Sequence, residues 1–288
     1  MQKFVPVKIT DKKWADKLLQ GEVFMRPLYE FGTWRNASGD TVLDNNYRGD
    51  IYSGATKVFS DPSDYEFLKG FPAQFRDAVD AVTLIDQSDV RFFKIFSLYC
   101  YEYDPKTDSL IKPDPRMAQF GDTAVIIINF CEFIDRFVRA IDRIYPHFSV
   151  LADQVQFFDL ETTKDLNPMF SKHIDQAYQK ELRMAVCEIE HDEFAIGPGA
   201  EDAYRIIEDL NSLKLQIGPI QDICITMPIN QFIDGWLPPG FRCRWPMNDF
   251  PKAPSIFELM LADTRKAMKN YHSILVKPLL RISGKKGS

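Results

Sequence analysis

The sequence predicts an α+β protein, in which a mixed β-sheet is flanked by helices and followed by a helical C-terminal extension. Three observations predict this class. The chain opens with a strand, a helix and a second strand; strongly β-prone segments recur later; and the segment after residue 129 has helical apolar spacing. The 288 residues, 45% of them apolar, suffice for one main domain with a sizeable core.

The opening unit is the clearest local pattern. Apolar residues alternate over residues 4–9, as in a strand, and Trp14 and Leu18 share one face of a helix over residues 11–20. Gly21 stands where helices often end in a left-handed residue, and residues 22–28 form the second strand. The polar stretch that follows, residues 32–50, predicts a long loop, and such loops are often functional.

The later elements set the domain boundaries. We predict strands at residues 91–103, 124–129, 150–160, 182–189 and 213–225, the last interrupted at Gly218 and Pro219. Helices are expected directly after residue 129, where Phe130, Ile134, Phe137 and Ile141 face the core, and at residues 200–210. We therefore expect one domain at residues 1–225, a Pro-rich linker at 226–254 and a basic helix at 255–288.

The C-terminal helix is expected to run from Ser255 to about residue 276. Ser255 and Glu258 form a capping box at its start, and Pro278 closes or kinks its end. Residues 251–288 hold eight basic and two acidic residues, so they carry +6, and the rest of the chain carries −12. Such an acidic body is not typical of a protein that coats DNA. The candidate partner-binding patch is Arg265, Lys266 and Lys269, and the structural alternative is a solvated helix face without a binding role.

Cysteine and histidine spacing predicts no metal site. The histidines are scattered, and no two cysteines are closer than 19 positions, so we expect no structural zinc. We expect buried, reduced thiols at Cys100, Cys131, Cys187 and Cys224. The first residues lack an apolar leader, and no apolar run is long enough to span a bilayer. We therefore expect a cytoplasmic protein without a membrane segment.

The common catalytic motifs are missing. The sequence contains neither a Walker A motif, nor G-x-G-x-x-G, nor G-x-S-x-G, which argues against P-loop nucleotidases, Rossmann dehydrogenases and serine hydrolases. What remains is a set of polar segments at strand ends. The set comprises residues 25–31, residues 47–50, the stretch Tyr178-Gln179-Lys180-Glu181-Leu182-Arg183, and residues 215–223.

The order of these segments resembles a family of bacterial and phage proteins that is linked to phage defence or counter-defence. The matching stretches are residues 19–31, 50–54, 120–127, 178–183 and 217–223, within a resemblance that covers roughly residues 4–225. A late glutamate that opens a strand, followed by an I-x-x-I strand, is also similar to ADP-ribosyltransferase toxins, including the DarT-type enzymes that modify nucleic acid. This resemblance implies an ADP-ribosyltransferase-like sheet core and NAD as a substrate.

The implied chemistry suits several residues of these segments. Cleavage of the nicotinamide–ribose bond passes through an oxocarbenium-like state, which a carboxylate stabilises, and Glu181 is the candidate. Tyr29 or Phe31 would stack on the nicotinamide, and Arg26 or Arg48 would bind the pyrophosphate. We predict that Glu181, Tyr29 and one of the arginines converge on one cleft. Structural roles are the alternative, with Glu181 a surface partner of Arg183 or Lys180 and Tyr29 packed.

Two functions stay open at this point. One is an ADP-ribosyltransferase toxin or effector that acts on a nucleic acid or a protein, which Glu181 and the basic tail favour. The other is a non-catalytic binding protein, such as a phage inhibitor that blocks a bacterial defence complex, which the acidic body favours. A protein partner fits both readings, and a nucleic acid fits the first.

Overall fold

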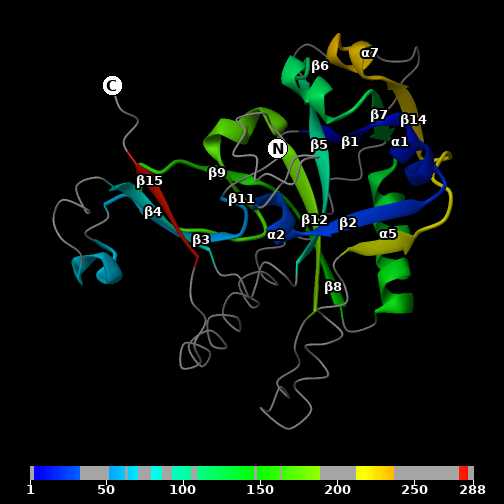
Figure 1. Cartoon of the computed structure of the whole chain (residues 1–288). Helices are drawn as coiled ribbons and strands as arrows, with labels where there is room; N and C mark the ends of the chain where they lie inside the picture. Colours follow the sequence, from blue (N-terminus) through cyan, green and yellow to red (C-terminus); the bar gives the residue numbers. More distant parts are fainter. Residues whose placement is uncertain are drawn as a thin grey trace, which may run out of the picture.

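The structure is a computed structural model of the chain (Figure 1). It describes residues 3–32, 52–61, 64–70, 79–85, 93–104, 109–145, 148–162, 164–188, 212–236 and 279–284. All features below belong to these residues.

A large antiparallel sheet is built around the long strand β5, Lys94–Asp104. One edge of β5 pairs with β12 (Glu181–Glu188), and the other edge pairs with β2 (Glu22–Pro27) and β1 (Lys3–Thr10). β2 pairs with the first residues of β5 and β1 pairs with its last residues. Residues 96–98 of β5, which lie between these two stretches, pair with neither strand on this edge. The sheet continues outward through β7 (Thr123–Ile127), β14 (Cys224–Pro228), β13 (Leu213–Gln216), β8 (Phe148–Gln154) and β6 (Ser109–Leu110).

Two helices cover one face of this sheet. α1 (Lys12–Leu19) follows β1, begins after Asp11 and ends where Gly21 takes a φ of +91°. α5 (Phe130–Ile144) begins at Asn129, whose side chain accepts a hydrogen bond from the backbone N–H of Glu132. The helical spacing expected from the sequence is confirmed, since Phe130, Phe137 and Ile141 are buried against the sheet and Ile134 packs at the edge of the same core.

Shorter elements cover the opposite face. They are α2 (Leu28–Gly32), η3 (Pro115–Phe120), η4 (Ile174–Gln179) and α7 (Ile229–Ile233). Phe232 of α7 is fully buried and packs edge-on against the ring of Tyr101 in the core of this face. The side chains of β5 therefore meet protein on both sides, because Phe96, Leu98 and Cys100 face the first core and Tyr99 and Tyr101 the second.

A smaller sheet packs beside the main one. Its order is β10 (Lys164–Asp165), β3 (Ala55–Phe59), β4 (Val79–Ile85) and β15 (Leu279–Gly284), and η2 (Glu66–Gly70) lies between β3 and β4 in the chain. Strands β9 (Gln156–Phe158) and β11 (Ser171–His173) form a separate parallel pair. The short helix η4 follows β11 directly in the chain. Figure 1 shows the smaller sheet and α5 on opposite sides of the central strands.

The α+β class predicted from the sequence is confirmed, and so are the opening strand–helix–strand and the long strand around residues 94–104. The expected strand at 213–225 is instead two strands in different branches of the main sheet, because β13 pairs with β2 and β14 pairs with β7. The core continues past residue 225, because β14 runs on to Pro228 and Phe232 of α7 is buried.

Two further expectations need correction. Residues 279–284, placed in a basic C-terminal helix, form strand β15, which pairs with β4 and so joins the C-terminal stretch to a sheet. Cys131 is exposed rather than buried, because it points away from the sheet in the first turn of α5, whereas Cys100 is buried and Cys224 is partly buried. The expected helices at 200–210 and 255–276 lie outside the described residues.

Candidate functional site: a buried carboxylate network and an arginine-lined pocket

Glu181, the candidate catalytic residue, opens strand β12 directly after the short helix η4. The chain turns between the two elements at Lys180, which adopts a left-handed conformation with a φ of +38°. The Lys180 side chain forms an ion pair with Glu102, and its backbone carbonyl accepts a hydrogen bond from Cys100. These contacts fix where β12 starts and turn the Glu181 side chain toward the face of the sheet that carries the short helices.

Both carboxylate oxygens of Glu181 are occupied by side chains of the protein itself. Oε1 accepts hydrogen bonds from the Ser97 hydroxyl at 2.5 Å and from Nε of Arg183 at 2.8 Å. Oε2 accepts a hydrogen bond from Nζ of Lys172 at 2.8 Å. Glu181 is only 6% exposed and Arg183 only 2%. From the sequence, the structural alternative for Glu181 is a surface ion pair with Arg183 or Lys180. Arg183 is indeed its partner, but the pair is buried and not on the surface.

The two cations have further partners that hold them in place. Lys172 Nζ also donates to Oε1 of Gln179, at 2.5 Å, and Arg183 Nη1 donates to the Met169 carbonyl at 2.7 Å. Burial by itself would raise the pKa of Glu181, but the charges of Arg183 and Lys172 outweigh it and hold that pKa far below the usual range. The carboxylate is thus ionised at neutral pH.

Lys8 lies beside this network, in the space between β1 and β2. Its Nζ donates to the Ser97 carbonyl at 2.8 Å and lies 4.6 Å from the centre of the Phe96 ring. Burial lowers the pKa of Lys8 to about 8, the nearby charge of Glu181 opposes that shift, and the charge of Arg26 adds to it. Lys8 thereby satisfies a carbonyl beside which the two neighbouring strands have separated.

The structure does not place Arg26 next to Glu181. Arg26 pairs in register with Ile95 on one edge of β5, and Glu181 pairs with Tyr99 on the other edge. Four register positions correspond to about 13 Å along the strand, and the two strands flanking β5 lie about 10 Å apart. The Arg26 guanidinium forms an ion pair with Glu30 at 3.8 Å instead.

The other predicted cofactor residues do not complete a cleft. Phe31 is partly buried and packs against the core between the main sheet and the smaller sheet, which is a structural role. The backbone of Tyr29 belongs to α2, but its side chain lies outside the described residues, as does all of Arg48. Arg265, Lys266 and Lys269 of the predicted partner-binding patch also lie outside them.

Two of the sequence segments that carry the family resemblance meet at a close backbone contact. Residues 19–21 and 217–220 exchange hydrogen bonds, from Ile217 N–H to the Gly21 carbonyl and from Ile220 N–H to the Leu19 carbonyl. A Cβ atom on Gly21 would lie 2.1 Å from the Gly218 carbonyl oxygen, so only glycine fits there. Gly21 is therefore explained by structure: it allows the end of α1 to pack closely against the segment that follows β13.

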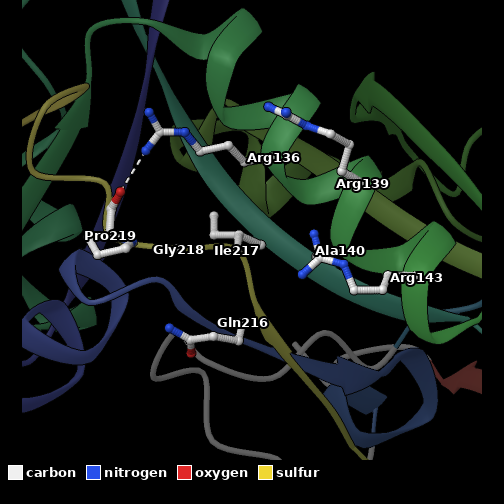
Figure 2. A pocket seen from close by; sticks show the side chains of 8 residues that line it. All are labelled: Arg136, Arg139, Ala140, Arg143, Gln216, Ile217, Gly218 and Pro219. Atoms are coloured by element: carbon white, nitrogen blue, oxygen red, sulfur yellow. Dashed lines mark hydrogen bonds between the residues drawn. The ribbon is translucent and has the colours of Figure 1, made fainter.

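Beside this contact lies a pocket that the sequence did not reveal. Its volume is about 460 Å³, and its walls include Arg136, Arg139 and Arg143 of α5 and the segment that follows β13 (Figure 2). The arginines stand at helical spacing in the sequence, which is the signal that could have identified this face.

Within the described residues, no group of three or more His, Cys, Asp or Glu side chains is arranged to hold a metal ion. In the same part of the chain, no helix is both long and apolar enough to cross a bilayer. Comparisons with protein-family models, with curated proteins and with solved structures gave no match for this chain. The function is therefore argued from the geometry of the two sites.

Proposed function

We propose that this chain is a non-catalytic binding protein of the conflict between bacteria and phages, which blocks a bacterial defence complex by binding to it. The observation that carries this proposal is the internal use of Glu181. A carboxylate that stabilises an oxocarbenium-like ribose has to face the substrate. Here both oxygens of that carboxylate are bonded to Ser97, Arg183 and Lys172, and the side chain is buried.

The biological setting of this proposal comes from the family resemblance of residues 4–225. The energetics of the network add a physical argument. Opening it to admit NAD would separate a buried carboxylate from two cations, which costs several kcal/mol before any substrate contact forms. The network joins β12 to β5, β11 and η4 through side-chain hydrogen bonds. Catalysis by Glu181 needs an accessible carboxylate, whereas this side chain is buried and bonded to its neighbours.

Incubation with NAD tests this proposal most directly. We expect the purified protein, with and without bacterial cell extract, to release no more free nicotinamide than buffer does. The measurement is chromatographic quantification of nicotinamide over several hours at neutral pH. Nicotinamide release by the wild-type protein that is lost in a folded Glu181→Gln variant would replace this proposal with the catalytic one.

ADP-ribosyl transfer from NAD to a nucleic acid or a protein is the second candidate function. One observation favours it: Glu181 is held ionised, as the reaction needs, by Arg183 and Lys172. For this reading, NAD would have to displace Lys172 or Ser97 from the carboxylate.

The basic patch supplies a test of the attraction to an acidic partner. Reversing Arg265, Lys266 and Lys269 to glutamate changes the local charge by six units, and it should weaken binding to an acidic probe by at least about tenfold at low salt. We expect the loss to shrink at high salt, since screening removes the same attraction. The measurement is titration with a poly-glutamate peptide and, separately, with a single-stranded oligonucleotide.

The two probes separate the two kinds of partner. Selective loss for the peptide supports a protein partner, and selective loss for the oligonucleotide supports a nucleic acid. If the triple reversal leaves both affinities unchanged at low salt, the C-terminal stretch is only a structural brace and the attraction has another origin.

A further inference from the structure

The pocket between α5 and the end of β13 is lined by positive charge on one wall. Arg136, Arg139 and Arg143 project from α5, and the lining residues that the structure describes include no carboxylate. The facing wall consists of Gln216, Ile217 and the Gly218-Pro219 turn. A pocket with guanidinium groups on one side and apolar surface on the other suits a ligand with an anionic group and an apolar or aromatic part.

The three arginines differ in how far they are committed to the protein. Arg136 is the most fixed: it bonds to both oxygens of Asp222, to the Pro219 carbonyl at 2.6 Å and to Glu132. Figure 2 shows its guanidinium group reaching toward Pro219. Hydrogen bonds to Asp222 and Glu132 raise its pKa above the ordinary arginine value. Arg136 therefore anchors α5 to this turn and gives the pocket a rigid wall.

Arg139 and Arg143 are more available. Arg139 is 59% exposed and forms ion pairs with Asp135 at 2.5 Å and with Glu132 at 3.8 Å, on the surface of the helix, where ion pairs are weak. Arg143 takes part in no ion pair within the described part of the chain. In Figure 2 its side chain extends from α5 toward the segment that carries Ile217. An incoming anion would thus meet two guanidinium groups without having to break a buried contact.

The facing wall leaves space for such a ligand. Gly218 has a φ of +83°, and a Cβ atom built on it would have no atom within 4 Å. Ile217 and Ala140 provide apolar surface, and the Gln216 amide donates to the Gln20 carbonyl through Nε2. A volume of about 460 Å³ lies within the usual range for small-molecule sites.

We propose that this pocket binds a phosphorylated small molecule of nucleotide size, with its phosphate groups on Arg139 and Arg143. Guanidinium groups bind phosphate oxygens in a bidentate manner, which is why the ligand class is phosphate rather than an apolar compound. The base or another flat part of the ligand lies on Ile217 and Pro219. The site belongs to the α5 face of the sheet, whereas Glu181 faces the opposite side, so it does not depend on the proposed function.

The test uses ADP and inorganic pyrophosphate as probes, in isothermal titrations of the full chain at constant ionic strength. We expect ADP to bind more tightly than pyrophosphate, and adenosine to bind least, because adenosine lacks the charged groups. Arg143→Ala should weaken ADP binding by about 10-fold to 100-fold, which is the usual effect of losing a charge-assisted hydrogen bond. Arg139→Ala should weaken it in the same direction.

Lys112→Ala is the matched control, because Lys112 is an exposed cation between β6 and η3 in the chain and is not among the lining residues of the pocket. Both Arg143 and Lys112 are exposed, so neither variant should disturb folding, and far-ultraviolet circular dichroism checks this. Unchanged ADP binding in Lys112→Ala with loss in Arg143→Ala supports the site. Equal losses in both variants, an unaffected Arg143→Ala variant, or no binding of either probe at millimolar concentration overturns it.

Discussion

Replacing Glu181 with glutamine should lower the free energy of unfolding by about 3–5 kcal/mol, the usual cost of removing one partner from a buried ion pair. The reason is the charge balance of the network. One carboxylate compensates two buried cations, Arg183 and Lys172, and glutamine would leave both of them without a counter-charge. Urea denaturation followed by circular dichroism measures the change.

Two further variants show whether charge balance is the cause. Lys172→Met keeps one cation and one anion, so we expect a smaller loss of about 1–3 kcal/mol, from the unmade hydrogen bonds to Gln179 and to Oε2 of Glu181. Glu102→Gln removes the partner of Lys180 in a pair that is partly exposed, and should cost only about 0–1 kcal/mol. Equal losses in all three variants would contradict the explanation.

The same network predicts a pH dependence. Arg183 and Lys172 depress the pKa of Glu181 in the folded protein, so the carboxylate stabilises the fold at every pH above its unfolded value of about 4.3. This stabilisation is lost as the pH falls through the folded-state pKa. The difference in stability between wild type and Glu181→Gln should therefore stay constant from pH 8 down to about pH 5 and shrink below about pH 4.

Replacing Gly21 with alanine should have the second large effect, a loss of about 3–5 kcal/mol. The backbone of Gly21 has a φ of +91°, which by itself costs an alanine about 1–2 kcal/mol. The added Cβ would also lie 2.1 Å from the Gly218 carbonyl oxygen, and relieving such a contact requires a backbone shift that costs about 1–3 kcal/mol or more.

Gly218→Ala is the matched control for this prediction. Its backbone is almost equally unusual, with a φ of +83°, but a Cβ atom there meets no atom within 4 Å. Only the backbone penalty applies, so we expect a loss of about 1–2 kcal/mol. The midpoints of urea denaturation compare the two variants. Similar losses would show that the close contact between residues 21 and 218 contributes little to stability.

At the candidate site, the local sequence predicts the position of Glu181 in a strand but not its partners. The position of Glu181 at the start of a strand follows from its neighbours in sequence, and β12 begins there. Its partners Ser97 and Lys172 come from β5 and β11, and nothing local to Glu181 indicates them. A buried carboxylate with three partners and an exposed catalytic one have the same sequence pattern, because burial depends on which elements cover the strand.

Local patterns determined the class and several elements of this protein. The α+β composition, the opening β1–α1–β2 unit, strand β5 and the core-facing side of α5 all follow from periodicity and end signals, which act over a few residues. Only the tertiary structure decided the rest. Residues 213–228 form β13 beside β2 and β14 beside β7, residues 279–284 pair with β4, and three arginines of α5 face the turn at Gly218. The physical reason is that strand pairing and ion pairing join residues that lie far apart in the chain, and their free energy depends on neighbours that periodicity does not encode.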